Sequence, residues 1–156
     1  VASTLTVSVL QIFEGSLEAV TALALFIPLL VGTGGNVGAQ AATSAVRALA
    51  VGEVRPSDAL RVSWRESRVG VLLGVVLGSL AFGAGSLVAG WGVGTTVGIS
   101  VVLVCIWAAT VGAVMPLMAK ALNIDPAVIS APLVTTLVDA TGLVIYFLVA
   151  GAVLGL

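Results

Sequence analysis

The feature that most constrains this chain is the run from Val69 to Ala119, which contains no charged side chain. An α-helix rises about 1.5 Å per residue, so about 20 residues cross the roughly 30 Å hydrocarbon core of a membrane. The run is long enough for two crossings. We expect the turn between Ala89 and Thr95, because its glycines interrupt a helix and Trp91 is typical of the membrane interface. The sequence therefore predicts an all-α membrane protein.

The remaining charged residues divide the chain into further neutral tracts. Of the 156 residues, 60% are hydrophobic and only 8% are charged, whereas soluble domains carry about a quarter charged residues. The tracts predict complete spans near 19–46, 68–90, 95–119 and 128–154, preceded by a partial span near 1–13. We expect this first span to begin upstream of Val1, so that the parent protein has five spans per subunit.

Composition also limits the chemistry that is open to this chain. It has no histidine and a single cysteine, Cys105, which argues against a disulfide framework, a zinc or thiolate cluster and histidine-based catalysis. The six basic and seven acidic residues nearly cancel, so nucleic-acid binding is not expected. No pair of nucleophile and base is expected within the membrane, and the chain is not predicted to be an enzyme. Any metal must be a hard cation that oxygen atoms bind.

The basic residues predict how the chain is oriented. Five of the six lie between Arg47 and Arg68, and the sixth, Lys120, falls in a loop on the same side of the predicted membrane. Basic loops face the cytoplasm, so we expect a multi-pass protein of the plasma membrane with its C-terminus outside. Glu14 and Glu18 are then outside, either as solvated residues at a helix boundary or as an acidic mouth that attracts cations.

Asp139 is the one acid that falls about half-way along a predicted span. A carboxylate at the centre of a bilayer costs at least about 2.5–3.5 kcal/mol, so such a residue generally faces a water-filled cavity or a partner. Thr135 and Thr136 lie one turn earlier on the same face, which predicts a ladder of oxygen ligands. No basic residue within a span can neutralise Asp139, and this favours a mobile cation. The alternative is a buried acid that is protonated or hydrogen-bonded to Thr136 or Thr141.

The segment from Pro28 to Gln40 carries four glycines, a proline and two amides. This composition predicts a helix that is interrupted at membrane depth, where free carbonyls and the amides of Asn36 and Gln40 face permeating ions. The alternative is close helix packing through Gly34 and Gly38. Further glycines at intervals of four predict close packing of the third and fourth spans: Gly70, Gly74, Gly78, Gly90, Gly94 and Gly98.

Two segments resemble the transmembrane domain of the MgtE family of magnesium channels. They are FIPLLVGTGGNVGAQAATSAVRALAVGEV, from Phe26, and DPAVISAPLVTTLVDATGLVIYF, from Asp125, and the resemblance covers essentially the whole chain. It implies that residues 1–156 are the pore domain of a homodimer, with the ion pathway at the subunit interface lined by the second and fifth spans. It also implies cytoplasmic regulatory domains that are not part of this chain. The expected ion is Mg²⁺, and Mn²⁺, Ca²⁺ and Co²⁺ also accept oxygen ligands.

The resemblance also assigns residues to the pore. Asp139 corresponds to the pore carboxylate that holds a hydrated divalent ion, and Thr135 lies one turn below it. Ala39 stands where the family often has asparagine, so this position brings no side-chain ligand. The predicted pore-lining positions are Gly32, Gly35, Asn36, Ala39, Thr43 and, from the oxygen ladder, Thr136.

Two acids near the cytoplasmic side have two interpretations each. Asp125 either caps the last helix or collects cations as a metal ligand at the inner mouth. Glu66 either pairs with the neighbouring arginines or enters a regulatory metal site.

The sequence as a whole predicts a Mg²⁺-selective channel. An ion-coupled secondary transporter of divalent cations is the main alternative, because a broken helix and an acid at mid-membrane also describe such carriers. A non-conducting scaffold that dimerises through its glycine faces is a further alternative.

Overall fold

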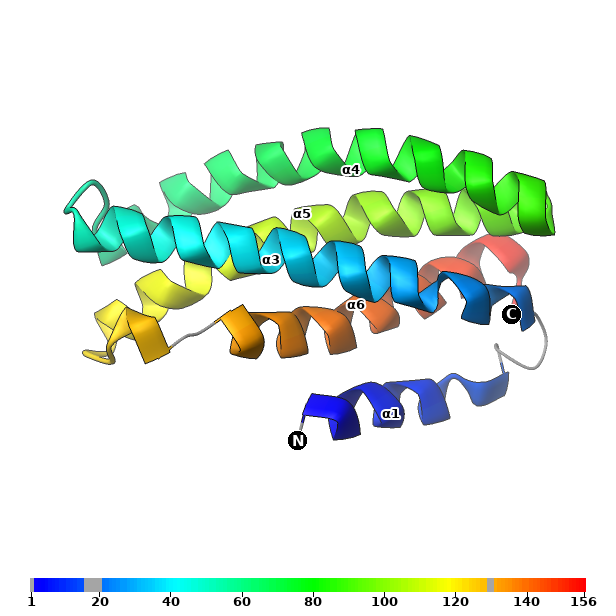
Figure 1. The fold of residues 1–156 in the computed structure, drawn as a ribbon, viewed down its shortest axis with the longest axis horizontal. Coiled ribbons are helices and arrows are strands. Elements are labelled where there is room, and N and C mark those ends of the chain that lie inside the picture. Colours follow the sequence, from blue (N-terminus) through cyan, green and yellow to red (C-terminus); the bar gives the residue numbers. More distant parts are fainter. Residues whose placement is uncertain (1, 16–20, 129–130) are drawn as a thin grey trace.

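The computed structural model describes residues 2–15, 21–128 and 131–156, and its regular structure is entirely helical (Figure 1). Its α-helices are α1 (Ala2–Ile12), α3 (Ile27–Ala50), α4 (Ala59–Ala89), α5 (Trp91–Ala121) and α6 (Ala131–Leu154). Short 3₁₀ helices precede three of them: η1 (Thr21–Phe26), η2 (Pro56–Asp58) and η3 (Pro126–Val128). The all-α prediction is confirmed.

Four helical stretches in the described residues are long and apolar enough to cross a membrane. They are Thr21–Ala50, Pro56–Ala89, Trp91–Ala121 and Ala131–Leu154, and they correspond to the four complete spans that the sequence predicts. Helix α1 corresponds to the predicted partial span.

Helix α5 is the centre of the bundle, because it packs against α3, α4 and α6. It is the most buried of the four long helices and α4 is the least buried, since α4 packs mainly against α5 (Figure 1). Helix α1 lies along α6, and the ring of Phe13 stacks on that of Phe147 with centroids 4.8 Å apart. Among the described residues, no helix packs against one long side of α4 or against one long side of α3.

A buried hydrogen bond ties the start of the second span to α6. The hydroxyl of Tyr146 donates to the carbonyl of Leu23 in η1 at 3.0 Å, and both residues are fully buried. Backbone polar groups at membrane depth need a partner inside the protein. Tyr146 supplies one within the 3₁₀ helix that precedes α3.

Glycines bring α4 and α5 together until their backbones touch. A Cβ atom added at Gly74 would lie 2.9 Å from the Cα of Val102, and one added at Gly78 would lie 2.8 Å from the carbonyl oxygen of Gly98. Small residues permit such approaches between membrane helices, where dispersion contacts replace the hydrophobic effect as the source of association. The predicted packing role is confirmed for five of the glycines and is wrong for Gly90, where an added Cβ would have nothing within 4 Å. The five are Gly70, Gly74, Gly78, Gly94 and Gly98.

The turn lies within the predicted segment but is shorter, and the third span begins earlier than the sequence predicts. The turn is the single residue Gly90, whose φ of 87° favours glycine, and α5 begins at Trp91. Helix α4 begins at Ala59 rather than near residue 68. Just before it, the backbone N–H of Arg55 donates to the carboxylate of Asp58 at 2.9 Å. Charged residues mark the edge of the hydrocarbon, whereas arginine, leucine and glutamate continue a helix readily beyond that edge.

The predicted interruption of the second span is wrong. Helix α3 is continuous from Ile27 to Ala50, with Pro28 in its first turn, where no intrahelical donor is lost. The alternative of close packing is confirmed, since a Cβ added at Gly34 would lie 2.7 Å from Val104 and one added at Gly38 would lie 3.2 Å from Val134. Packing gained on the glycine side outweighs the low helix propensity of the segment.

Paired alanine substitutions on α4 test this account of the fold. Gly74→Ala should destabilise the protein by about 1–3 kcal/mol, because the added methyl group meets the backbone of Val102. Gly83→Ala is the matched control: nothing lies within 4 Å of its added Cβ, so the gain in helix propensity should stabilise it by up to about 1 kcal/mol. Thermal unfolding in detergent measures both, and equal effects of the two substitutions would contradict the proposed backbone contact.

Candidate cation site

The carboxylate of Asp139 on α6 rests against the backbone of Gly35 on α3. A Cβ atom added at Gly35 would lie 3.2 Å from Oδ1 of Asp139 and 3.6 Å from Cγ2 of Thr135. Any larger residue at position 35 would occupy the space that these two side chains share. The close approach of α3 to α6 therefore brings three of the predicted site residues together.

The Oδ1 atom of Asp139 is buried and accepts no hydrogen bond from the described residues. The hydroxyl of Thr136 donates instead to the carbonyl of Pro132 at 2.8 Å, and that of Thr141 donates to Leu137 at 2.7 Å. The hydrogen-bonded form of the alternative is therefore contradicted, whereas its protonated form stays a prediction. A buried carboxylate oxygen without a donor is unusual in a folded protein and is suited to a cation or to the water around one.

Hydroxyl groups extend the oxygen surface below Asp139. Thr135 donates to the carbonyl of Pro132 at 3.0 Å, as Thr136 also does. Because each hydroxyl proton is engaged within α6, each oxygen keeps lone pairs with which to accept from a hydrated ion. Thr135, Thr136 and Asp139 are all half-buried, so this surface is partly accessible in the single chain.

A polar stripe runs along the outward side of α3. Its members recur every three or four residues and are exposed: Gly32, Asn36, Gln40, Thr43 and Arg47. The hydroxyl of Thr43 donates to the carbonyl of Ala39 at 2.8 Å, and Ala39 is half-buried at the border of the stripe. The opposite side of α3 carries the buried glycines and alanines. Helix α3 thus turns small residues inward and polar residues outward.

This geometry divides the predicted pore-lining residues into two groups. Gly35 is buried in contact with Asp139, whereas Gly32, Asn36 and Thr43 lie on the exposed stripe. The sequence-based set omits Arg47, which continues the stripe by one further turn. The signal that could have found it is the helical interval of three to four residues counted from Gly32.

The two acids with two interpretations make local contacts. Oδ1 of Asp125 accepts a hydrogen bond from the backbone N–H of Ala127 at 2.9 Å, in the short helix η3 rather than at the start of α6. Glu66 lies 3.1 Å from a guanidinium nitrogen of Arg65, which confirms the ion-pair interpretation. Glu14 is exposed, and Glu18 lies outside the described residues. Among the residues that the structure describes, no three acidic or cysteine side chains gather into a metal-binding group.

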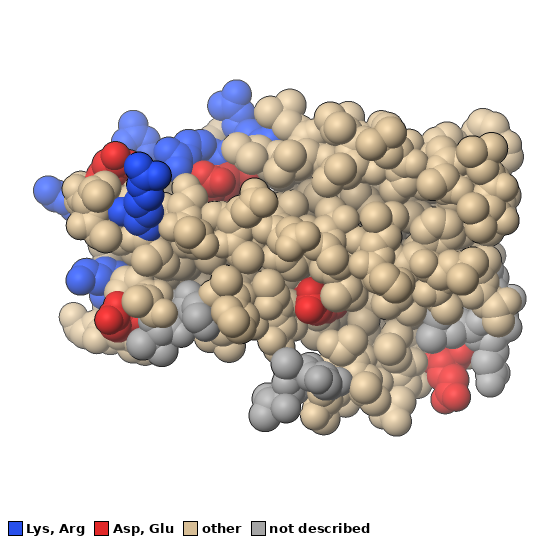
Figure 2. Space-filling model, viewed as in Figure 1, with Lys and Arg blue, Asp and Glu red and all other residues tan. Residues whose placement is uncertain are grey.

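The basic residues occupy one end of the bundle. They lie at or next to the α3–α4 connection and at the end of α5, and Figure 2 shows those visible on one face gathered at that end. The other end carries the Gly90 turn and the C-terminal residues. This asymmetry is the one that the positive-inside rule uses.

Helix α6 is held on both sides of Asp139. The indole N–H of Trp107 on α5 donates to the hydroxyl of Thr141 at 2.8 Å. Thr141 follows Asp139 by two residues, so it points to a different side of α6. The Gly35 contact and the Trp107 contact together fix how α6 is rotated, and with it where the carboxylate points.

An alanine at position 35 tests this geometry. Gly35→Ala should lower the affinity for Mn²⁺ or Mg²⁺ about tenfold, because the added Cβ displaces a carboxylate whose contacts are worth about 1.5 kcal/mol or more. Gly32→Ala on the same helix adds a Cβ with nothing within 4 Å and should leave the affinity unchanged. Protection against thermal unfolding by the metal measures the affinity. Equal protection of both variants would contradict a site at Asp139.

Comparison with known proteins connects this geometry to a family. A model of the MgtE family, described as divalent cation transporters, matches residues 27–149, which include α3, α4, α5 and most of α6. The magnesium transporter MgtE of Thermus thermophilus is 48% identical over 145 residues, which are 93% of this chain and 32% of that protein. The proteins of the same name from Bacillus subtilis and Enterococcus faecalis are 34% and 33% identical over 146 residues. This chain spans about a third of the length of these curated relatives. All three relatives are named as transporters, not as enzymes.

Proposed function

The chain belongs to the MgtE family of divalent cation transporters, and we propose that it forms the pore of a Mg²⁺-selective channel. The observation that carries this proposal is the position of Asp139. Its Oδ1 atom is buried without a hydrogen-bond donor, against Gly35 on the helix that carries the polar stripe. An acid at this depth in a membrane generally belongs to an ion pathway. The names of the relatives favour magnesium as the ion.

A second copy of the chain completes the pathway in this proposal. In a single copy of the protein, Asn36, Gln40 and Thr43 are exposed on a helix that is long and apolar enough to cross the membrane. Amides and hydroxyls at that depth require water or protein around them, not lipid. In a two-fold symmetric dimer the two stripes face each other, line a water-filled path and bring two copies of Asp139 to the axis.

Two carboxylates on a symmetry axis suit hydrated Mg²⁺. This ion loses its water reluctantly and is usually held by one or two carboxylates through water molecules. Thr135 and Thr136 offer further acceptors along α6, and binding by a single pair of acids stays weak enough to allow release. Mn²⁺, Ca²⁺ and Co²⁺ also accept oxygen ligands and are expected to compete for the site.

The unbroken α3 helix supports a channel over an ion-coupled carrier. Many carriers bind their ions where transmembrane helices are discontinuous, whereas α3 is continuous past Asp139 from Ile27 to Ala50. Single-channel recording separates the two functions, because a channel gives discrete current steps and a carrier does not.

In the proposed orientation the basic end of the bundle faces the cytoplasm and the C-terminus is outside, in a plasma membrane.

Neutralising the acid at mid-membrane tests the proposal. In liposomes that contain the purified protein, Asp139→Asn should reduce Mg²⁺ influx at least about tenfold, because an amide does not attract a divalent ion as two carboxylates do. Glu53→Gln neutralises an exposed loop acid and should keep the wild-type influx. Selective conduction of Mg²⁺ over K⁺ by Asp139→Asn would show that this carboxylate is not the cation site.

A further inference from the structure

Helix α4 carries a stripe of side chains that the proposed pore does not use. Its members are spaced by seven, seven, four and three residues, so they fall on one face of the helix: Arg61, Arg68, Val75, Ser79 and Phe82. The stripe begins in the basic end of the bundle and continues into the apolar span. Helix α4 packs mainly against α5, on the side of the bundle away from the carboxylate site.

The first part of this stripe offers unpaired positive charge. Arg61 and Arg68 are exposed, and no acidic side chain among the described residues lies within 4.0 Å of either guanidinium group. Arg65 between them pairs with Glu66 at 3.1 Å. The indole of Trp64 is 69% exposed on the same turn. Arginine clusters and tryptophan next to a membrane span are typical of contact with anionic lipid headgroups.

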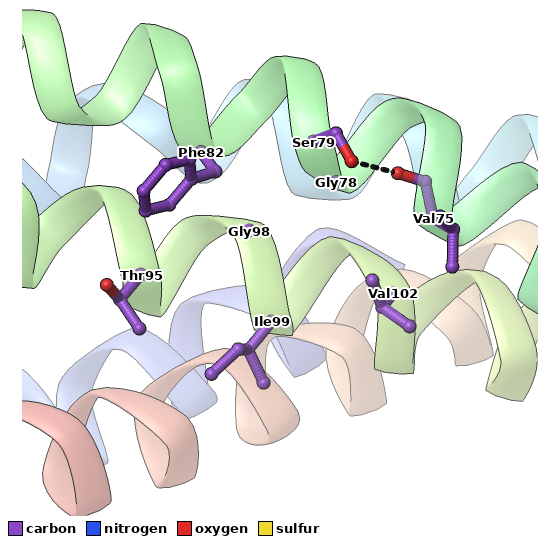
Figure 3. Close-up of a pocket in the computed structure, with 8 residues that line it drawn as sticks. All are labelled: Val75, Gly78, Ser79, Phe82, Thr95, Gly98, Ile99 and Val102. Carbon is purple, nitrogen blue, oxygen red and sulfur yellow. Dashed lines mark hydrogen bonds between the residues drawn. The ribbon is translucent and has the colours of Figure 1, made fainter.

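The second part of the stripe is one wall of an apolar groove of about 340 Å³ between α4 and α5 (Figure 3). Val75, Ser79 and Phe82 face Thr95, Ile99 and Val102 across it. Gly78 and Gly98 also line the groove at the point where the two backbones touch.

The polar atoms in this groove are already satisfied. The hydroxyl of Ser79 donates to the carbonyl of Val75 at 2.6 Å, as Figure 3 shows, and that of Thr95 donates to Trp91 at 2.8 Å. Each hydroxyl therefore donates a hydrogen bond within its own helix and needs no acceptor from a ligand. An occupant meets a surface of methyl groups, glycine backbone and one aromatic ring, which suits a hydrocarbon chain.

We propose that this stripe binds one anionic phospholipid, with its phosphate between Arg61 and Arg68 and one acyl chain in the α4–α5 groove. The distances agree, since Val75 lies about 10 Å along the helix from Arg68 and one leaflet of hydrocarbon is about 15 Å deep. An acyl chain that starts at the arginines thus reaches the groove before it reaches the centre of the membrane. The positive charge of the two arginines selects the headgroup, and the α4–α5 groove holds the acyl chain.

Competition between two lipids with the same acyl chains tests the proposal. The purified protein in detergent is offered dioleoyl phosphatidylglycerol and dioleoyl phosphatidylcholine, and native mass spectrometry counts the bound lipid. We expect the anionic lipid to be preferred. The double substitution Arg61→Gln/Arg68→Gln should reduce this preference about thirtyfold, at about fivefold for each arginine near the surface. Lys120→Gln removes one charge at the same end of the bundle but off the stripe, and should leave the preference unchanged.

A second pair of variants tests the groove separately from the charge. Ser79→Phe fills the groove and should reduce the binding of phosphatidylglycerol severalfold, whereas Leu80→Phe alters a neighbouring exposed residue outside the groove and should not. Helical content by circular dichroism shows that each variant is folded.

Three results would overturn the proposal. The first is equal binding of the two lipids to the unaltered protein, and the second is a preference that survives loss of both arginines. The third is displacement of phosphatidylglycerol by millimolar inorganic phosphate, which would identify a site for a soluble anion.

Discussion

Backbone contact at glycine is the interaction on which this bundle depends. Lipid tails are as apolar as leucine, so membrane helices associate through close packing rather than through the hydrophobic effect. Glycines on α3, α4 and α5 meet neighbouring helices so closely that an added Cβ would collide with backbone or valine atoms. Gly112 of α5 meets the backbone of Gly38 in this way. These contacts decide which side of α3 turns inward, and everything exposed on α3 follows from that choice.

The polar surface of the protein is a consequence of this packing. Because the buried glycines Gly34, Gly35 and Gly38 of α3 pack against α5 and α6, its amides face outward in one stripe. The same approach of α3 to α6 leaves just enough room at Gly35 for the carboxylate of Asp139. Trp107 holds α6 from another side through Thr141. Close packing of the helices thus places Asp139 beside the polar stripe of α3, and the proposed dimer encloses both.

Charge carries most of what the sequence could predict. The neutral tracts predict the four long apolar stretches, because the cost of burying charge in hydrocarbon is large and local. The same cost singled out Asp139 before any contact was known. The cost of burying charge does not indicate whether the second span is a continuous helix. The glycines near Asn36 weaken a helix in isolation, yet α3 is continuous, because their packing partners on α5 and α6 are far away in the sequence.

Other parts of the structure depend on geometry that a sequence does not display. The start of α4 at Ala59 could not be read from charge, since a helix continues past the membrane surface. The helical interval from Gly32 places Arg47 on one line with Asn36 and Gln40, but only the rotation of α3 shows that this line is exposed. The contact between Asp139 and Gly35 joins residues of the second and last spans, and spacing along the chain contains no signal for it. The position of Asp139 within a neutral tract singles it out in the sequence, and packing shows why its neighbour is glycine.

The location of a bound divalent ion tests the central claim most directly. Crystals of the protein grown with Mn²⁺ and measured at the manganese absorption edge would locate the ion by anomalous scattering. The account predicts a peak on a two-fold axis between two copies of Asp139, at a distance that leaves room for water. A peak only at exposed acids such as Glu53, with none beside Asp139, would contradict it.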